Sequence, residues 1–259
     1  MLKRILKILL LIPAIYLIAI PGFYSHRHND AVCKKIRITI IDSARYHFVT
    51  RRDIQNTIVR NHGNLVGKPL KDIKTDEIEK TVNRYRELRK AEVYFGIDGT
   101  LHIYVDQRTP VMRVMANNGG DYYIDNEGVV IPRRNLYTPR LHIVGGNVNI
   151  SQSMLNGVSV LDTANRKSIL KDIFYLVSYI NNDDFWSAQI DQIYVDGNDE
   201  IDLIPRVGNH TIHLGTTENF EAKFKNLEAF YDKVLPEVGW NKYSVINLAF
   251  RDQIVCKRR

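Results

Sequence analysis

The feature that most constrains this chain is an apolar run near its start, from Ile5 to Tyr24 (ILKILLLIPAIYLIAIPGFY), in which Lys7 is the only charge. A bilayer core about 30 Å thick needs about 20 helical residues, so the run is long enough to cross a membrane. Lys3 and Arg4 precede it, and no acidic residue occurs before Asp30. This charge order predicts a single-pass anchor with a cytoplasmic N-terminus, and it places the rest of the chain beyond the membrane.

Two other interpretations of the run remain open. A cleaved signal peptide has the same order of charge, and Ile8 to Ile20 would form its apolar core. However, the residues that follow (IPGFYSHRHND) contain no site of small residues, and Cys33 lies too far along the chain for lipid attachment. A buried helix of a soluble protein is the other alternative. We therefore favour an uncleaved anchor.

Composition indicates an ordinary globular protein after the anchor. The chain has 259 residues, of which 44% are hydrophobic and 25% charged, which favours one or two domains. Four of its 36 basic residues and none of its 29 acidic ones lie in residues 1–29. The rest of the chain therefore has nearly equal numbers of basic and acidic residues. That balance argues against nucleic-acid binding. Cys33 and Cys256 could be bridged, but two free thiols are the favoured state.

The next part of the chain, residues 30–108, begins with an alternating strand, Lys35–Ile41. Thr50, with Asp53 three residues later, predicts a capped helix that buries Ile54 and Ile58.

A second helix is expected from Thr75 to Leu88. Two strands follow, Ala91–Ile97 and Thr100–Val105, and Asp98-Gly99 between them is typical of a hairpin turn. Residues 30–108 therefore predict a β-α-α-β-β order, a small sheet covered by two helices.

Residues 109–259 are predicted to form a second, sheet-rich α+β domain. Short strands are interrupted by an irregular stretch, 147–162, and by helices at about 163–180 and 218–235, the latter capped by Thr217. The last segment, Tyr243–Cys256, alternates between polar and apolar residues and predicts two closing strands, Tyr243–Phe250 and Gln253–Cys256. A terminal strand is often an edge strand, which can accept a strand from a partner. A strand that is paired or self-protected is equally compatible with the sequence.

We find no catalytic pattern in the sequence. Phosphate-binding loops and the GxSxG, SxxK and HExxH motifs are missing. His210 and His213 are three residues apart, and on a strand this spacing directs them to opposite faces. We predict a protein that is not an enzyme and that has no cofactor and no metal.

Several stretches in a fixed order carry a resemblance to a known family. They are Ile36-Arg-Ile-Thr-Ile followed by a capped helix, Ala91-Glu-Val-Tyr-Phe with the hairpin after it, Gln107-Arg108-Thr-Pro110, Tyr122 to Pro132, and Ile246 to Lys257. Behind an anchor of the right polarity, this order resembles the FtsQ/DivIB family of bacterial cell division proteins over nearly the whole chain.

The resemblance implies a cytoplasmic tail and transmembrane helix in residues 1–29, a POTRA domain in 30–108 and a β domain with a C-terminal edge strand in 109–259. It implies a non-catalytic divisome assembly protein of the inner membrane and division septum, which scaffolds septal cell-wall synthesis by binding FtsB and FtsL. In this family the edge strand pairs with a strand of FtsB. The corresponding residues here are Phe250, as an apolar anchor, and the strand Gln253, Ile254, Val255 and Cys256.

Two alternatives compete with this interpretation. A membrane-anchored POTRA protein that acts like a chaperone for secretion or outer-membrane clients would bind at the POTRA strand edges and would not need the C-terminal strand. A periplasmic enzyme would instead need a concave pocket with converging titratable groups.

Overall fold

The structure is a computed structural model that describes residues 31–42, 46–133, 137–251 and 253–259. The expected anchor, Ile5–Tyr24, lies outside these residues. Within them, no helix has both the length and the apolar character needed to cross a bilayer. The chain divides into two compact units, with the boundary between Gln107 and Arg108.

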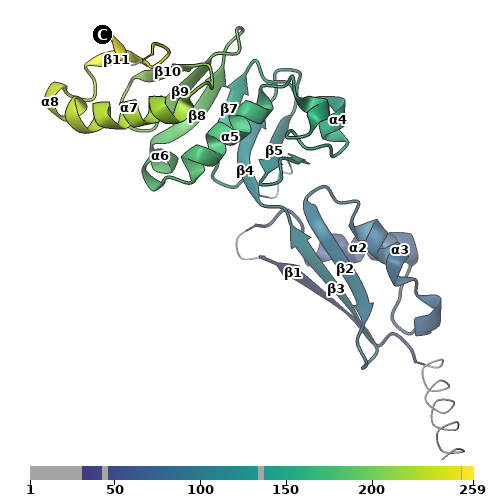
Figure 1. The fold of residues 1–259 in the computed structure, drawn as a ribbon. Coiled ribbons are helices and arrows are strands. Elements are labelled where there is room, and N and C mark those ends of the chain that lie inside the picture. The colour runs from purple at the N-terminus through teal and green to yellow at the C-terminus, as the bar shows by residue number, and fades with distance from the viewer. Residues whose placement is uncertain (1–30, 43–45, 134–136, 252) are drawn as a thin grey trace, which may run out of the picture. The chain divides into compact units, whose positions relative to one another are not determined.

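The described part of the first unit is a three-stranded sheet with its helices packed on one face (Figure 1). Strand β3 lies in the centre, parallel to β1 and antiparallel to β2. The order β-α-α-β-β is confirmed. In chain order the elements are β1 (Lys35–Ile41), α2 (Arg51–His62), a 3₁₀ turn (Leu70–Asp72), α3 (Thr75–Val82), β2 (Leu88–Phe95) and β3 (Thr100–Gln107).

The start of α2 follows the capping signal in the sequence. The Thr50 hydroxyl accepts a hydrogen bond from the Asp53 amide at 3.2 Å, and the Asp53 carboxylate accepts one from the Thr50 amide at 2.9 Å. Ile54 and Ile58 are completely buried beneath the helix. Both predictions are confirmed. The capping box fixes the start of the helix because it satisfies two backbone donors that would otherwise have no partner within the helix.

The second helix ends earlier than expected. The sequence predicted a helix to Leu88, but α3 stops at Val82 and Leu88 already belongs to β2. The Asn83 side chain accepts a hydrogen bond from the Ala91 amide at 2.8 Å and donates one to the Ala91 carbonyl at 3.4 Å. These bonds hold the chain where it reverses into the strand, so a tertiary contact overrides the helical period.

The described part of the second unit is built on a nine-stranded sheet in the order β12-β11-β10-β9-β8-β7-β4-β5-β6. Neighbouring strands are antiparallel except for the pairs β4–β7, β7–β8 and β10–β11. The strands are β4 (Pro110–Met115), β5 (Asp121–Asp125), β6 (Val130–Pro132), β7 (His142–Gly146), β8 (Ile190–Val195), β9 (Ile201–Pro205), β10 (Thr211–Gly215), β11 (Tyr243–Asn247) and β12 (Val255–Arg258).

The longer helices of this unit cover one face of the sheet (Figure 1). Buried side chains of α5 and α7, such as Ile173, Val177, Phe224 and Leu227, pack in one core with the sheet. The helices are α4 (Gln152–Leu155), α5 (Leu170–Asn181), α6 (Asp184–Gln189), α7 (Phe220–Lys233) and α8 (Leu235–Val238). The mixed α+β class is confirmed.

Several expected boundaries in this unit are wrong. The stretch 147–162 contains α4, and α5 begins only at Leu170, after a 3₁₀ turn at Thr163–Asn165. Helix α6 was missed. The Asp183 carboxylate caps α6 by accepting the Trp186 amide hydrogen at 2.8 Å.

Helix α7, for which the sequence predicted Thr217 as the cap, starts after Asn219, which has a φ of 51° and makes no capping bond. Thr217 is therefore not its cap. The first closing strand is shorter than expected, and the second has the expected length but starts two residues later. Strand β11 ends at Asn247 and β12 begins at Val255, so Gln253 and Ile254 precede β12.

Candidate functional site

Strand β12 forms one end of the large sheet. It runs antiparallel to β11, with Asn247 opposite Val255 and Ile246 opposite Cys256. Ser244 is the extra residue of a bulge in β11, because the register shifts between Tyr243 and Val245. The expectation that the C-terminal strand forms a sheet edge is confirmed.

Two hydrogen bonds determine which backbone groups of β12 face outwards. The Leu248 amide donates to the His213 carbonyl of β10 at 2.8 Å, and the Arg259 amide donates to the Lys242 carbonyl at 3.3 Å. Backbone groups of successive residues in a strand point alternately to its two sides. The N–H and C=O groups of Val255 and Lys257 therefore face β11, and those of Cys256 face the open edge together with the N–H group of Arg258. The Arg258 carbonyl accepts a hydrogen bond from the Ser244 hydroxyl at 3.4 Å.

The side chains of this segment lie on two faces. Ile254 and Cys256 are partly buried and pack against the core. Val255, which is 45% exposed, and Lys257 lie on the other face. Both cysteines of the chain are free thiols, with Cys33 buried and Cys256 partly so. Burial raises the pKa of the Cys256 thiol, which makes it a packing residue rather than a reactive one.

The other two predicted site residues, Phe250 and Gln253, lie in the loop between β11 and β12. Phe250 is 55% exposed, a large apolar surface to leave in water. With Gln253 and Ile254 it borders a groove of about 540 Å³ whose opposite wall is the start of α7. A second hollow of about 300 Å³ continues along Asn226 and Ala229 of the same helix, again against Gln253 and Ile254.

Lys223 fixes the α7 wall of this groove to the sheet. Its ammonium donates to the carbonyls of Leu214 at 2.9 Å and Thr216 at 2.8 Å. Burial lowers the pKa of Lys223, while the nearby Glu218 carboxylate opposes this shift. The groove thus combines an apolar floor, formed by Leu248 and Ile254, with a polar rim. That combination suits a peptide segment whose apolar side chain rests on the floor while its polar backbone meets the rim.

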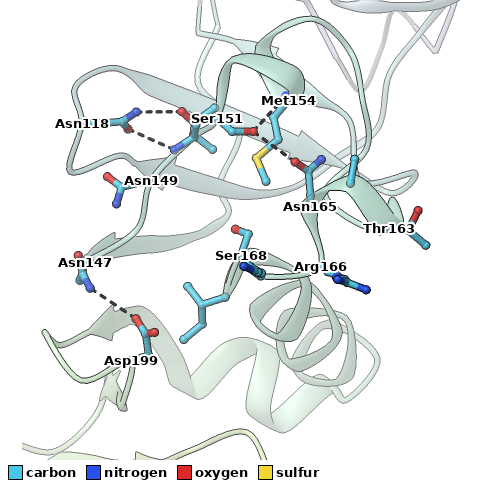
Figure 2. A pocket seen from close by; sticks show the side chains of 14 residues that line it. Asn118, Asn147, Asn149, Ser151, Met154, Thr163, Asn165, Arg166, Ser168 and Asp199 are labelled. Atoms are coloured by element: carbon cyan, nitrogen blue, oxygen red, sulfur yellow. Dashed lines mark hydrogen bonds between the residues drawn. The ribbon is translucent and has the colours of Figure 1, made fainter.

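A separate hollow of about 580 Å³ lies between the 147–151 segment and the approach to α5 (Figure 2). Several of its polar side chains already bond within the protein. The Asn118 side chain bonds both the amide and the carbonyl of Ile150, and the Asn165 side-chain oxygen accepts from Ser151 and Ser153. We interpret this network as support for the irregular 147–169 connection.

His210 and His213, which are close in sequence, bond to different partners in the part of the chain that the structure describes. His213 bonds Asp202 at 2.8 Å and lies 3.6 Å from the Glu200 carboxylate, whereas His210 is buried and bonds Tyr231 at 2.7 Å. His210 lies just before β10, so the strand alternation from which the sequence separated the two histidines applies only to His213. Within the described residues, no three His, Cys, Asp or Glu side chains gather in a way that could hold a metal ion.

The fold and this surface define a two-unit protein with a small POTRA-type sheet and a large sheet that ends in an open strand. Comparison with protein families agrees with both units. Residues 31–106 match a POTRA-like domain, and residues 109–257 match the family described as FtsQ/DivIB, C-terminal related. The second match covers more than half of the chain, so this protein belongs to the FtsQ/DivIB family. A comparison with curated proteins found no match.

Sequence reasoning missed the helical wall of the groove. Lys223, Asn226 and Ala229 belong to the polar side of α7, which in sequence is indistinguishable from any solvated helix face. Only the packing of α7 beside the β11–β12 loop makes them part of the surface. The alternation of Tyr243–Cys256 gave the opposite wall.

Proposed function

We propose that this protein is a non-catalytic assembly protein of the bacterial division machinery, held in the inner membrane with both units in the periplasm. It scaffolds septal cell-wall synthesis by binding FtsB and FtsL, and a strand of FtsB adds to the outer side of β12. Membership of the FtsQ/DivIB family supports a role in cell division. The single observation that carries the binding mode is the open edge of β12 beside a groove with an apolar floor.

Backbone pairing alone would be weak. Cys256 and Arg258 offer three backbone groups, since the Arg258 carbonyl already bonds the Ser244 hydroxyl, and each hydrogen bond contributes about 0.5–1.5 kcal/mol net. Association costs several kcal/mol, so a stable complex also needs apolar burial. The groove supplies it, because an apolar partner side chain beside the added strand would cover Phe250 and rest on Ile254. Phe250 is therefore the proposed anchor, and the outward backbone of β12 gives the register.

The proposal is tested by binding of residues 31–259 to a soluble FtsB–FtsL fragment, measured by calorimetry. Phe250→Ala should weaken binding at least tenfold, because it removes a large apolar contact at the centre of the surface. The matched control is Phe185→Ala, since Phe185 is 49% exposed but lies outside the groove. This control should bind like the unsubstituted protein.

A second pair of variants tests the strand itself. Cys256→Pro removes an outward N–H group, whereas Cys256→Ala removes the same thiol and keeps that group. We expect the proline variant to lose the partner and the alanine variant to keep it, with unchanged circular dichroism in both. Equal binding by all four variants would refute β12 as the site. It would direct attention to the strand edges of the POTRA-like unit and to a chaperone-like role.

A further inference from the structure

One end of the first unit exposes apolar side chains that no fold requirement explains. Ile97, in the turn between β2 and β3, is as exposed as in an extended peptide, at 104%. Val66 is 46% exposed and Val32 41%. Isolated exposed apolar residues are common, but here three lie on segments that meet at one end of the sheet.

Backbone hydrogen bonds hold these segments together. The Lys34 amide donates to the Gly99 carbonyl at 2.9 Å, which ties the start of β1 to the β2–β3 turn (Figure 1). On the other side, the Cys33 amide donates to the Lys68 carbonyl at 2.9 Å and the Gly67 amide to the Cys33 carbonyl at 2.8 Å. Residues 32–34 are therefore clamped between the 96–99 turn and the 65–69 loop.

At Gly99 the β2–β3 turn lies against the backbone of the entering chain. Its φ of +79° is one that L-residues rarely adopt, and a Cβ at this position would lie 2.9 Å from the Val32 carbonyl oxygen. The turn and the entering chain thus form one fixed surface. We call it the basal tip, defined by Val32, Lys34, Lys35, Val66, Lys68, Lys71 and the turn 96–99.

The charge at the basal tip is predominantly positive. Lys34, Lys35, Lys68 and Lys71 are all exposed. The carboxylates described at this end are Asp98, which accepts hydrogen bonds from the Thr100 hydroxyl and amide, and Asp72 in the neighbouring 3₁₀ turn. Exposed lysines therefore outnumber the acidic groups on these segments, and the Lys68 ammonium donates to the His62 carbonyl at 3.1 Å.

The sequence places this tip next to the membrane. The predicted anchor ends at Tyr24, ten residues before Lys34, and ten residues span at most about 36 Å. Because residues 31–34 are bonded into the tip, it is the part of the first unit that the chain tethers nearest to the bilayer. Exposed apolar side chains among lysines suit an anionic lipid interface, where apolar groups enter the headgroup layer and lysines approach the phosphates.

We propose that the basal tip docks on anionic phospholipid headgroups of the membrane that holds the anchor, with Ile97 entering the headgroup layer. This contact would set the orientation of the POTRA-like unit relative to the membrane. It rests on the anchor that forms part of the proposed function, and it is independent of strand addition at β12.

The test measures the depth of Ile97 in the membrane with the full-length chain reconstituted in vesicles. Tryptophan is introduced as Ile97→Trp, and its quenching by lipids with brominated acyl chains is recorded with and without phosphatidylglycerol. The native tryptophans, Trp186 and Trp240, both lie in the second unit, and the unsubstituted protein supplies their background. Ile41→Trp is the matched control, because Ile41 is 45% exposed at the other end of β1, about 20 Å from Lys35.

We expect stronger quenching at position 97 than at position 41 in phosphatidylglycerol vesicles. The difference should fall in neutral phosphatidylcholine vesicles and in 1 M salt, which shortens the screening length to about 3 Å. Lys34→Gln and Lys35→Gln, added to Ile97→Trp, should each lower the docked-to-undocked ratio about fivefold.

Equal quenching at positions 97 and 41 would overturn the proposal, as would quenching at 97 that ignores lipid charge and salt. Failure of the full-length chain to float with vesicles would overturn it through the anchor on which it rests. Neither result would affect the binding of residues 31–259 to FtsB–FtsL, so the two proposals fail separately.

Discussion

Replacing Gln107 with methionine should destabilise the first unit by about 3 kcal/mol. Gln107 is only 4% exposed, and its side-chain oxygen accepts hydrogen bonds from the amides of Phe48 at 3.0 Å and Val49 at 3.1 Å. Its side-chain nitrogen donates to the Tyr46 carbonyl at 2.8 Å. Methionine keeps the volume and removes these three bonds, and each buried backbone group that loses its partner costs about 1–3 kcal/mol.

The two units can be followed separately in one denaturant titration of residues 31–259. Both tryptophans belong to the second unit, so their fluorescence reports its unfolding alone, whereas far-ultraviolet circular dichroism reports both units. Gln107→Met should shift the dichroism transition that fluorescence does not share. A control, Gln55→Met, replaces an exposed glutamine on α2 and should leave both transitions within about 0.5 kcal/mol.

The reasoning is wrong if Gln107→Met shifts the first unit's transition by less than about 1 kcal/mol. It is also wrong if the fluorescence transition moves by the same amount, since the damage would then not be confined to the 46–49 segment. Either result would mean that the junction at Gln107 matters for another reason than these bonds.

Two further predictions concern the second unit. Replacing Arg108 with methionine removes the charged partner of Asp125, whose side chain is 1% exposed. The Asp125 carboxylate still accepts hydrogen bonds from the Glu127 and Val129 amides. We expect a loss of about 2 kcal/mol in the fluorescence transition, and a loss below about 0.5 kcal/mol would contradict a structural role for the pair. The second prediction is that this unit loses stability as pH falls. Burial holds the pKa of His142 and of His210 below the usual range, while the unfolded chain takes up these protons near pH 6.5. Below that pH the unfolded state binds more protons than the folded state. The free energy of unfolding should therefore be lower at pH 5.5 than at pH 7.5, by at most about 1.4 kcal/mol per pH unit for each histidine. His142→Gln and His210→Gln should flatten this dependence, and an unchanged slope would exclude these groups as its source.

Local chemistry explains which parts of the fold could be predicted. The Thr50–Asp53 capping box and the Asp98-Gly99 turn are complete within a few residues, so the sequence alone is enough to identify them. The end of α3 depends instead on a bond from the Ala91 amide to the Asn83 side chain, eight residues away in sequence, and the helix predicted to Leu88 gave no hint of it. Helix α6 was missed because an aspartate that stops one helix can equally cap the next.

At the site, too, the sequence predicts what depends on one strand and not what depends on its neighbours. The alternation of Tyr243–Cys256 predicts which side chains share a face, because that period is a property of one strand. It cannot predict which backbone groups remain open, because a strand has two hydrogen-bonding sides and only its neighbours determine which side is used. Here the choice follows from the Leu248 bond to β10 and the Arg259 bond to Lys242. Together they make Cys256 and Arg258, rather than Val255, the residues whose backbone can meet a partner. A proline at position 255 would therefore remove an N–H group that faces β11, and its effect on binding would say nothing about the open edge.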